Sequence, residues 1–227
     1  MENTATQPHP AAIEFTQTFR EWVNHALDFV QPLDHWLFKK INSEWTTDWA
    51  NQFFPWATDL HKHPVFYIVA PVLIALVFAK KFKLQTISLM IVLTLCLAWS
   101  DYAGGKVKRA VERPRPFQFT EISVNQLSPA GENSSFYSNH TTNNFALAAF
   151  VTYFMPVLSW MFFTIAFTVG YSRIYNGVHF PSDVFVGAVM GMLWGNMFGG
   201  FGLRMLTKNM REQLVSEKKF SLKKKGA

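Results

Sequence analysis

The stretch SRIYNGVHFPSD, residues 172–183, decides the fold because it is a short polar segment between two long apolar runs. No charged residue occurs from Thr141 to Ser172 before it, and none occurs from Val184 to Leu203 after it. A helix needs about 20 apolar residues to cross the ~30 Å hydrocarbon core of a bilayer. The segment therefore predicts a turn between two membrane-spanning helices.

Apolar runs upstream of this turn predict the rest of a helical bundle. The uncharged run 141–172 would form a helix of about 48 Å at ~1.5 Å per residue, which is too long for one span. We therefore expect the chain to turn at Pro156. Two further uncharged runs, 64–79 and 84–100, each predict one helix. The expected fold is an all-α polytopic membrane bundle of about five transmembrane helices over residues 63–205.

Composition agrees with a membrane protein and excludes other classes. Of the 227 residues, 49% are hydrophobic and 16% are charged, which excludes a disordered chain. The single cysteine, Cys96, lies in an apolar run and excludes a disulfide framework or a cysteine metal site within one chain. In the last apolar run, glycines recur at every fourth position, which predicts one helix face that packs closely on a neighbour. They are Gly187, Gly191, Gly195 and Gly199.

The two ends of the chain differ in charge. Residues 1–62 hold eight Asp or Glu and four Lys or Arg, and Phe15 to Asn42 has apolar residues at near-helical spacing. This run predicts amphipathic helix lying in the membrane interface and broken near Pro32. Residues 206–227 form a basic tail that accounts for most of the net charge of +6. With no base-reading motif beside it, the tail indicates contact with anionic lipid rather than nucleic acid.

Lysines near the span ends predict the orientation, because cytoplasmic ends of membrane proteins are enriched in Lys and Arg. Lys80, Lys81 and Lys83 and the basic tail mark the inside. An odd number of spans then places three segments on the outer side of the membrane. They are residues 1–62, 101–140 and 172–183.

Three polar clusters fall at these outer helix ends: KRAVERPRP (108–116), YSNHT (137–141) and SRIYNGVHFPSD (172–183). Polar residues gathered at one depth of an apolar bundle indicate a functional site. Lysine and arginine can surround a tetrahedral anion. One histidine can attack phosphorus, a second can protonate the leaving oxygen, and a carboxylate can orient the first ring.

The spacings Lys108-x6-Arg115-Pro116, Ser138-x-His140 and Ser172-Arg173-x5-His179-x3-Asp183 resemble, in order, the three signatures of the type 2 phosphatidic acid phosphatase (PAP2) superfamily. The resemblance covers about residues 64–204 and implies that His179 is the nucleophile, Asp183 orients it and His140 protonates the leaving group. It also implies that no metal and no cofactor are used. The phosphate-binding residues that it implies are Lys108, Arg115, Ser138 and Arg173.

The chain departs from the family pattern at one position and is ambiguous at another. Asn139 stands where the family commonly has glycine, and asparagine tolerates glycine-like backbone angles, so we expect its backbone donor to bind phosphate as well. Lys106-x6-Arg113-Pro114 also fits the first signature. We favour Lys108 and Arg115 because Phe117 follows them, as in close relatives of the family.

The resemblance implies a membrane lipid phosphatase with its active site on the outer side of a bacterial inner membrane. A lipid phosphate or diphosphate of the undecaprenyl diphosphate, phosphatidic acid or phosphatidylglycerol phosphate type is the expected substrate, cleaved through a phosphohistidine. One alternative is a phosphotransferase that passes the phosphate to another lipid such as lipid A. A second alternative is a non-catalytic anion-binding membrane protein. The soluble haloperoxidases of the superfamily are disfavoured by the uncharged runs.

Overall fold

The computed structural model describes residues 10–59, 64–131, 134–208, 210–212 and 214–216, and every regular element in these residues is helical. In chain order the α-helices are α1 (Pro10–Lys39), α2 (Asp48–Asp59), α3 (Pro64–Phe82), α4 (Gln85–Val111), α5 (Asn139–Phe154), α6 (Ser159–Tyr175) and α7 (Pro181–Met205). Three short helical turns complete the set: η1 (Lys40–Glu44), η3 (Pro116–Gln118) and η4 (Pro156–Leu158).

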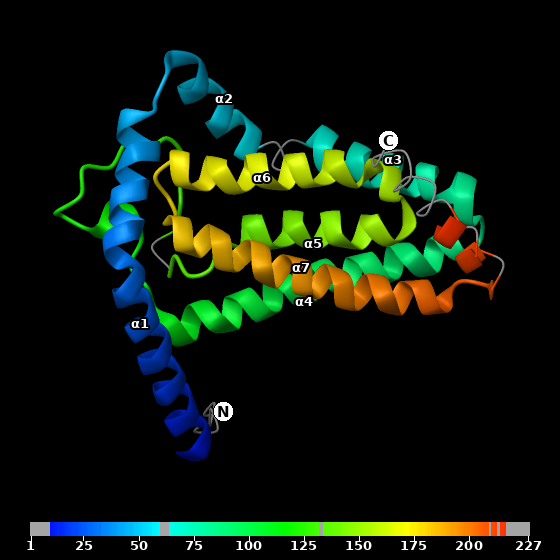
Figure 1. The fold of residues 1–227 in the computed structure, drawn as a ribbon, viewed down its shortest axis with the longest axis horizontal. Helices are drawn as coiled ribbons and strands as arrows, with labels where there is room; N and C mark the ends of the chain where they lie inside the picture. Colours follow the sequence, from blue (N-terminus) through cyan, green and yellow to red (C-terminus); the bar gives the residue numbers. More distant parts are fainter. Residues whose placement is uncertain (1–9, 60–63, 132–133, 209, 213, 217–227) are drawn as a thin grey trace, which may run out of the picture.

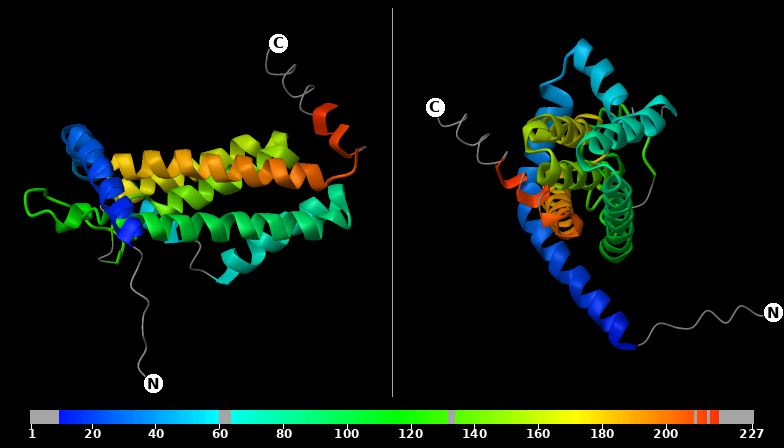
Figure 2. Two further views of the ribbon diagram at one scale, coloured as in Figure 1. Left: turned by 90° about the horizontal axis from the view of Figure 1, so that it is seen from below. Right: turned by 90° about the vertical axis from the view of Figure 1, so that its right-hand side faces the viewer.

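Helices α3 to α7 form a bundle with α5 at its centre, and α1 lies across the end of the bundle at which α7 begins (Figure 1). The other two views show the same arrangement (Figure 2). Helix α5 packs against α4, α6 and α7. Its middle turns are buried because these three helices cover them, and the buried residues include Phe145, Ala146, Ala149 and Phe150. The central position of α5 explains why its apolar residues do not follow one face.

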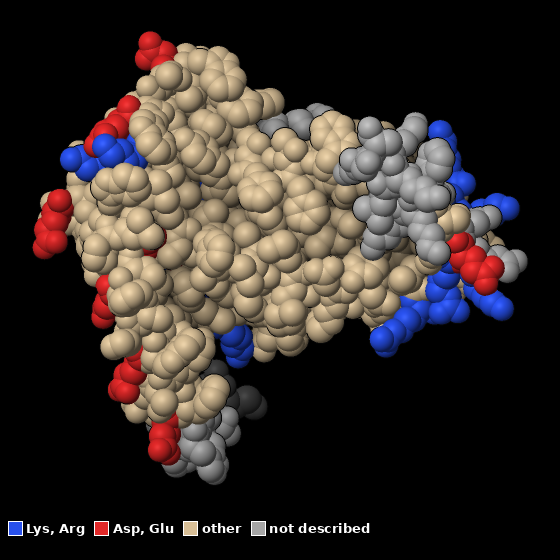
Figure 3. All heavy atoms as spheres, in the orientation of Figure 1, with Lys and Arg blue, Asp and Glu red and all other residues tan. Residues whose placement is uncertain are grey.

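The predicted all-α membrane bundle is confirmed, with five bundle helices in the described part of the chain. Three helical stretches there are long and apolar enough to cross a bilayer, namely Gln85–Gln118, Pro156–Tyr175 and Pro181–Met205. Large apolar side chains such as Ile87, Phe167 and Phe185 point outward. Figure 3 shows that the middle of the face in view is almost free of charged side chains. An apolar exterior of this kind suits contact with lipid rather than water.

Two predicted boundaries were wrong. Helix α1 runs through Pro32 without a break, because residues on both sides of the proline are buried against the bundle, Val23 and Leu27 before it and Phe38 after it. Helix α4 continues past the apolar run to Val111 and ends where Glu112 takes a left-handed conformation with φ 55°. The predicted turn at Pro156 is confirmed by the short helical turn Pro156–Leu158.

The glycine face of α7 packs directly on α5. A Cβ atom built on Gly191 would lie 2.3 Å from the backbone oxygen of Thr142, and one on Gly195 would lie 2.4 Å from that of Ala146. No real Cβ approaches an oxygen so closely, so the two helices are in contact through their backbones. The close packing predicted from the glycine spacing is confirmed.

We expect Gly191→Ala to destabilise the protein by about 1–3 kcal/mol, the typical penalty for overpacking a tight contact. Gly200→Ala is the matched control on the same helix, because the added Cβ would meet no other helix within 4 Å. Thermal unfolding in detergent should show a lower Tm for Gly191→Ala only. Equal melting of the two variants would contradict the backbone contact between α5 and α7.

Candidate active site

His179 lies in the turn between α6 and α7 and is only 3% exposed. The turn depends on Gly177, whose φ of +77° favours glycine. The backbone N–H of His179 donates to the backbone oxygen of Arg173 at 3.2 Å, and this hydrogen bond closes the turn. Helix α7 then begins at Pro181, and Asp183 accepts a hydrogen bond from the backbone N–H of Phe180 at 2.8 Å. The local sequence thus holds the imidazole and the carboxylate side by side.

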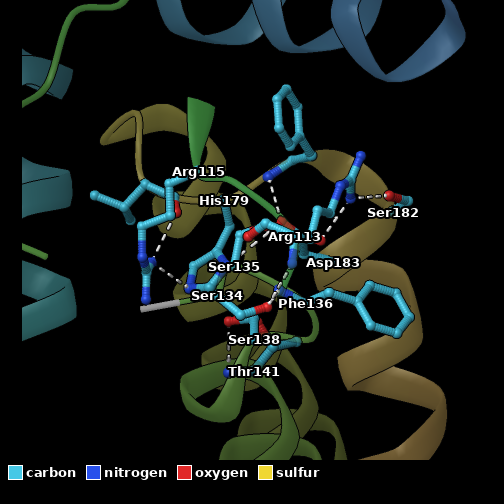
Figure 4. A network of polar contacts seen from close by, with 12 residues as sticks. Arg113, Arg115, Ser134, Ser135, Phe136, Ser138, Thr141, His179, Ser182 and Asp183 are labelled. Atoms are coloured by element: carbon cyan, nitrogen blue, oxygen red, sulfur yellow. Dashed lines mark hydrogen bonds and ion pairs between the residues drawn. The ribbon is translucent and has the colours of Figure 1, made fainter. Parts of the chain in front are cut away.

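The contacts of the His179 ring define its tautomer. The Nη1 atom of Arg115 lies 3.4 Å from Nε2, and arginine can only donate, so Nε2 carries a lone pair. The other ring nitrogen, Nδ1, therefore carries the proton and faces Oδ2 of Asp183 at 3.6 Å. Burial lowers the pKa of His179 to about 3, although Asp183 opposes this shift. The ring is consequently neutral at physiological pH, with Nε2 directed toward Arg115 (Figure 4).

Three cationic side chains from different elements lie near His179, and Arg115 is the one in contact with Nε2. Lys108, in the last turn of α4, donates to the backbone oxygens of Ser134 and Ser135 at 3.0 and 3.2 Å. Arg115 donates to the backbone oxygen of Val178 at 2.9 Å. Arg173 donates to Oγ1 of Thr58 at 2.9 Å. Lys108 and Arg173 are close enough for their charges to lower the pKa of His179, so the cluster can hold an anion.

The alternative lysine is placed differently. Lys106 is exposed, and its Nζ lies over the ring of Tyr102, 5.5 Å from the centroid. Two residues along a helix turn the side chain by about 200°, so Lys106 and Lys108 point to different sides of α4. The geometry therefore favours the Lys108 and Arg115 register over the Lys106 and Arg113 register.

The middle signature lies at the start of α5, beside His179 in Figure 4. Ser138 caps this helix and accepts from the backbone N–H and the hydroxyl of Thr141. Its own N–H donates to the backbone oxygen of Asp183 at 3.1 Å, which ties α5 to α7. The Asn139 side chain points elsewhere and donates to Asp101 at 3.0 Å, leaving only its backbone for the site. His140 is partly buried in the first turn of α5.

Asn139 fits because α4 has a glycine opposite it. A Cβ atom on Gly104 would lie 2.4 Å from Oδ1 of Asn139. The asparagine therefore occupies the space that a side chain at position 104 would need. Gly104 thus leaves room for the Asn139 side chain in this structure.

Arg113 has a role that the sequence did not reveal. Its Nη1 atom donates to Oδ1 of Asp183 at 2.6 Å, and its Nη2 atom donates to Oδ2 of Asp34 at 2.7 Å. It therefore supports the carboxylate behind His179 instead of facing an anion. Asp34 on α1 and Thr58 on α2 were missed altogether. No pattern in the sequence distinguishes Asp34 from neighbouring acidic residues such as Asp28.

The described residues contain no group of three or more His, Cys, Asp or Glu side chains arranged to hold a metal ion. The polar groups around His179 are instead mostly hydrogen-bond donors. Donors of this kind suit a phosphate or another tetrahedral oxyanion.

Lys108→Ala should weaken the binding of inorganic phosphate about tenfold or more, because a charge-assisted hydrogen bond contributes roughly 1.5–3 kcal/mol. Lys106→Ala should change the affinity less than twofold, since this lysine faces Tyr102. Isothermal titration of the detergent-purified protein measures both constants. If Lys106→Ala weakens phosphate binding more than Lys108→Ala does, the first signature consists of Lys106 and Arg113 instead.

Comparison with known proteins gives consistent matches. The chain is 32% identical over 88 residues to the undecaprenyl-diphosphatase BcrC of Bacillus subtilis, which covers 39% of this chain and 45% of that protein. It is 31% identical over 98 residues to a lipid A 1-phosphatase of Rhizobium johnstonii, covering 42% and 40%. The chain thus spans less than half the length of these curated relatives.

A solved structure matches more of the chain. The crystal structure of LpxE from Aquifex aeolicus aligns with a TM-score of 0.59 at 30% identity, covering 71% of this chain and 92% of that one. The sequence profile described as PAP2 superfamily matches residues 89–204, a stretch that contains all three polar clusters. The chain belongs to the PAP2 superfamily and is a multi-pass membrane protein.

Proposed function

We propose that this protein removes phosphate from a lipid phosphate or diphosphate through a phosphohistidine intermediate on His179. One observation carries the proposal. A buried neutral imidazole has its lone pair at Nε2 facing Arg115 and its proton at Nδ1 facing Asp183. Anion binding alone requires no nucleophile, so this arrangement disfavours the non-catalytic alternative.

The proposed reaction has two steps. In the first, Nε2 of His179 attacks phosphorus, an N–P bond forms, and the bond from phosphorus to the lipid oxygen breaks. His140 gives its proton to that oxygen, and Asp183 stabilises the positive charge on the phosphorylated ring. In the second, water attacks phosphorus, the N–P bond breaks, and His140 takes a proton from the water. Lys108, Arg115 and Arg173 hold the phosphate oxygens throughout.

Charge distribution supports an outer-leaflet location for this reaction. Lys and Arg gather at the end of the bundle opposite α1, whereas Asp and Glu gather along α1 (Figure 3). The basic end includes Lys80 and Lys81 at the end of α3 and Arg204 at the end of α7. Under the positive-inside rule that end is cytoplasmic. His179 then faces the outer side of what we propose is a bacterial inner membrane.

Two observations support the proposed substrate class: the position of the site at the end of the bundle, and the names of the related proteins. The site lies at the end of an apolar bundle, so a lipid can present its phosphate while its tail stays in the bilayer. One relative is named an undecaprenyl-diphosphatase and another a lipid A 1-phosphatase. We propose undecaprenyl diphosphate first, with phosphatidic acid and phosphatidylglycerol phosphate as further candidates. Transfer to a second lipid such as lipid A is the alternative outcome.

A panel of these lipid phosphates, tested on detergent-purified protein without an acceptor lipid, tests the proposal. We expect release of inorganic phosphate from at least one of them, and acid-labile radiolabel on the protein when the lipid carries labelled phosphate. His179→Ala should abolish both signals because the nucleophile is gone. Labelling without phosphate release would indicate the transferase. Label that persists in His179→Ala would contradict the assignment of the nucleophile.

A further inference from the structure

We infer that Asp34, on the N-terminal helix α1, is a positioning residue for His179 that acts through Arg113 and Asp183. This role rests on the proposed function of His179 as the nucleophile. Asp34 lies outside residues 89–204, the stretch that matches the superfamily profile. The N-terminal helix would therefore be part of the catalytic unit as well as a membrane-interface element.

A continuous chain of contacts joins Asp34 to the His179 ring. Asp34 is only 3% exposed, and its carboxylate accepts a hydrogen bond from Nη2 of Arg113 at 2.7 Å. Nη1 of the same guanidinium donates to Oδ1 of Asp183 at 2.6 Å. The other oxygen of Asp183 faces Nδ1 of His179 at 3.6 Å. Figure 4 shows Arg113, Asp183 and His179 close together.

Asp34 also fixes the first turn of α7. Its Oδ1 accepts from the backbone N–H of Ser182 at 2.8 Å, and its Oδ2 accepts from the hydroxyl of Ser182. Ser182 directly precedes Asp183, so Asp34 holds the backbone that carries the orienting carboxylate. A carboxylate is also favoured at this site because it faces the start of a helix.

The charge balance explains why a second carboxylate is needed. If Arg113 paired with Asp183 alone, the pair would be neutral and would stabilise a phosphorylated, positively charged imidazole poorly. With Asp34 on the other side of the guanidinium, the three groups carry one net negative charge, which favours the cationic ring. Asp34 does not touch the cations that hold phosphate, so it should affect bond formation at Nε2 and leave ground-state anion binding unchanged.

Asp34→Asn tests this role, because it removes the charge and nearly preserves the shape. Vanadate mimics the transition state by bonding to the nucleophile, whereas inorganic phosphate only occupies the anion site. We expect Asp34→Asn to weaken vanadate binding at least tenfold and to change phosphate binding less than twofold, measured by titration of the full chain in detergent. With p-nitrophenyl phosphate as probe, kcat should fall at least tenfold at nearly constant KM. Asp34→Glu should recover most of the vanadate affinity.

Leu27→Ala is the matched control, because Leu27 anchors α1 in an apolar cluster and has no polar contact with the charged groups. It should lower the Tm without changing the ratio of vanadate to phosphate affinity. An unchanged ratio in Asp34→Asn, or the same change in Leu27→Ala, would overturn the positioning role. Absence of vanadate binding in the wild type would overturn the proposed function and the role of Asp34 with it.

Discussion

Two buried carboxylates, Asp34 and Asp183, share the single guanidinium of Arg113, and the geometry of the candidate site depends on this interaction. The side chains of Arg113, Asp34 and Asp183 are 8%, 4% and 0% exposed. Breaking a buried ion pair by removing one partner is strongly destabilising, because the remaining charge is left uncompensated. The constraint therefore requires α1, the segment after α4 and the start of α7 to assemble together, and that assembly places the Asp183 carboxylate beside Nδ1 of His179.

The packing of the bundle makes this assembly possible. Contact between the glycine face of α7 and the backbone of α5 brings the starts of both helices to one place, where the N–H of Ser138 donates to the oxygen of Asp183 at 3.1 Å. Helix α4 continues beyond its apolar run, and its last turn carries Lys108 to the end of the bundle where α5 and α7 begin. Helix α2 also contacts the site, because Oγ1 of Thr58 accepts a hydrogen bond from Arg173. Lys108, Arg173 and Asp183 are thus carried by helices of the bundle, and the turn that holds His179 joins two of these helices.

Much of this arrangement could be predicted from the sequence. Apolar runs gave the number of bundle helices, Pro156 gave a turn and the four-residue glycine repeat gave the contact between α5 and α7, because each follows from local composition and helical geometry. The structure also gathers Lys108, Arg115, Arg173 and Asp183 around His179. Asp34 and Thr58 could not be predicted, since their importance arises only from contacts far away in sequence. Pro32 was misread because tertiary contacts on both sides override its local effect.

In the proposed reaction, Nε2 of His179 bonds to phosphorus, Asp183 lies behind Nδ1, and Lys108, Arg115 and Arg173 contact the phosphate oxygens. A crystal or cryo-EM structure of the detergent-purified protein with orthovanadate tests this most directly. We expect vanadium bonded to Nε2 of His179, with its oxygens contacted by Lys108, Arg115 and Arg173 and with Arg113 still between Asp34 and Asp183. Vanadate bound elsewhere, or held by Lys106 and Arg113 away from the His179 ring, would contradict it.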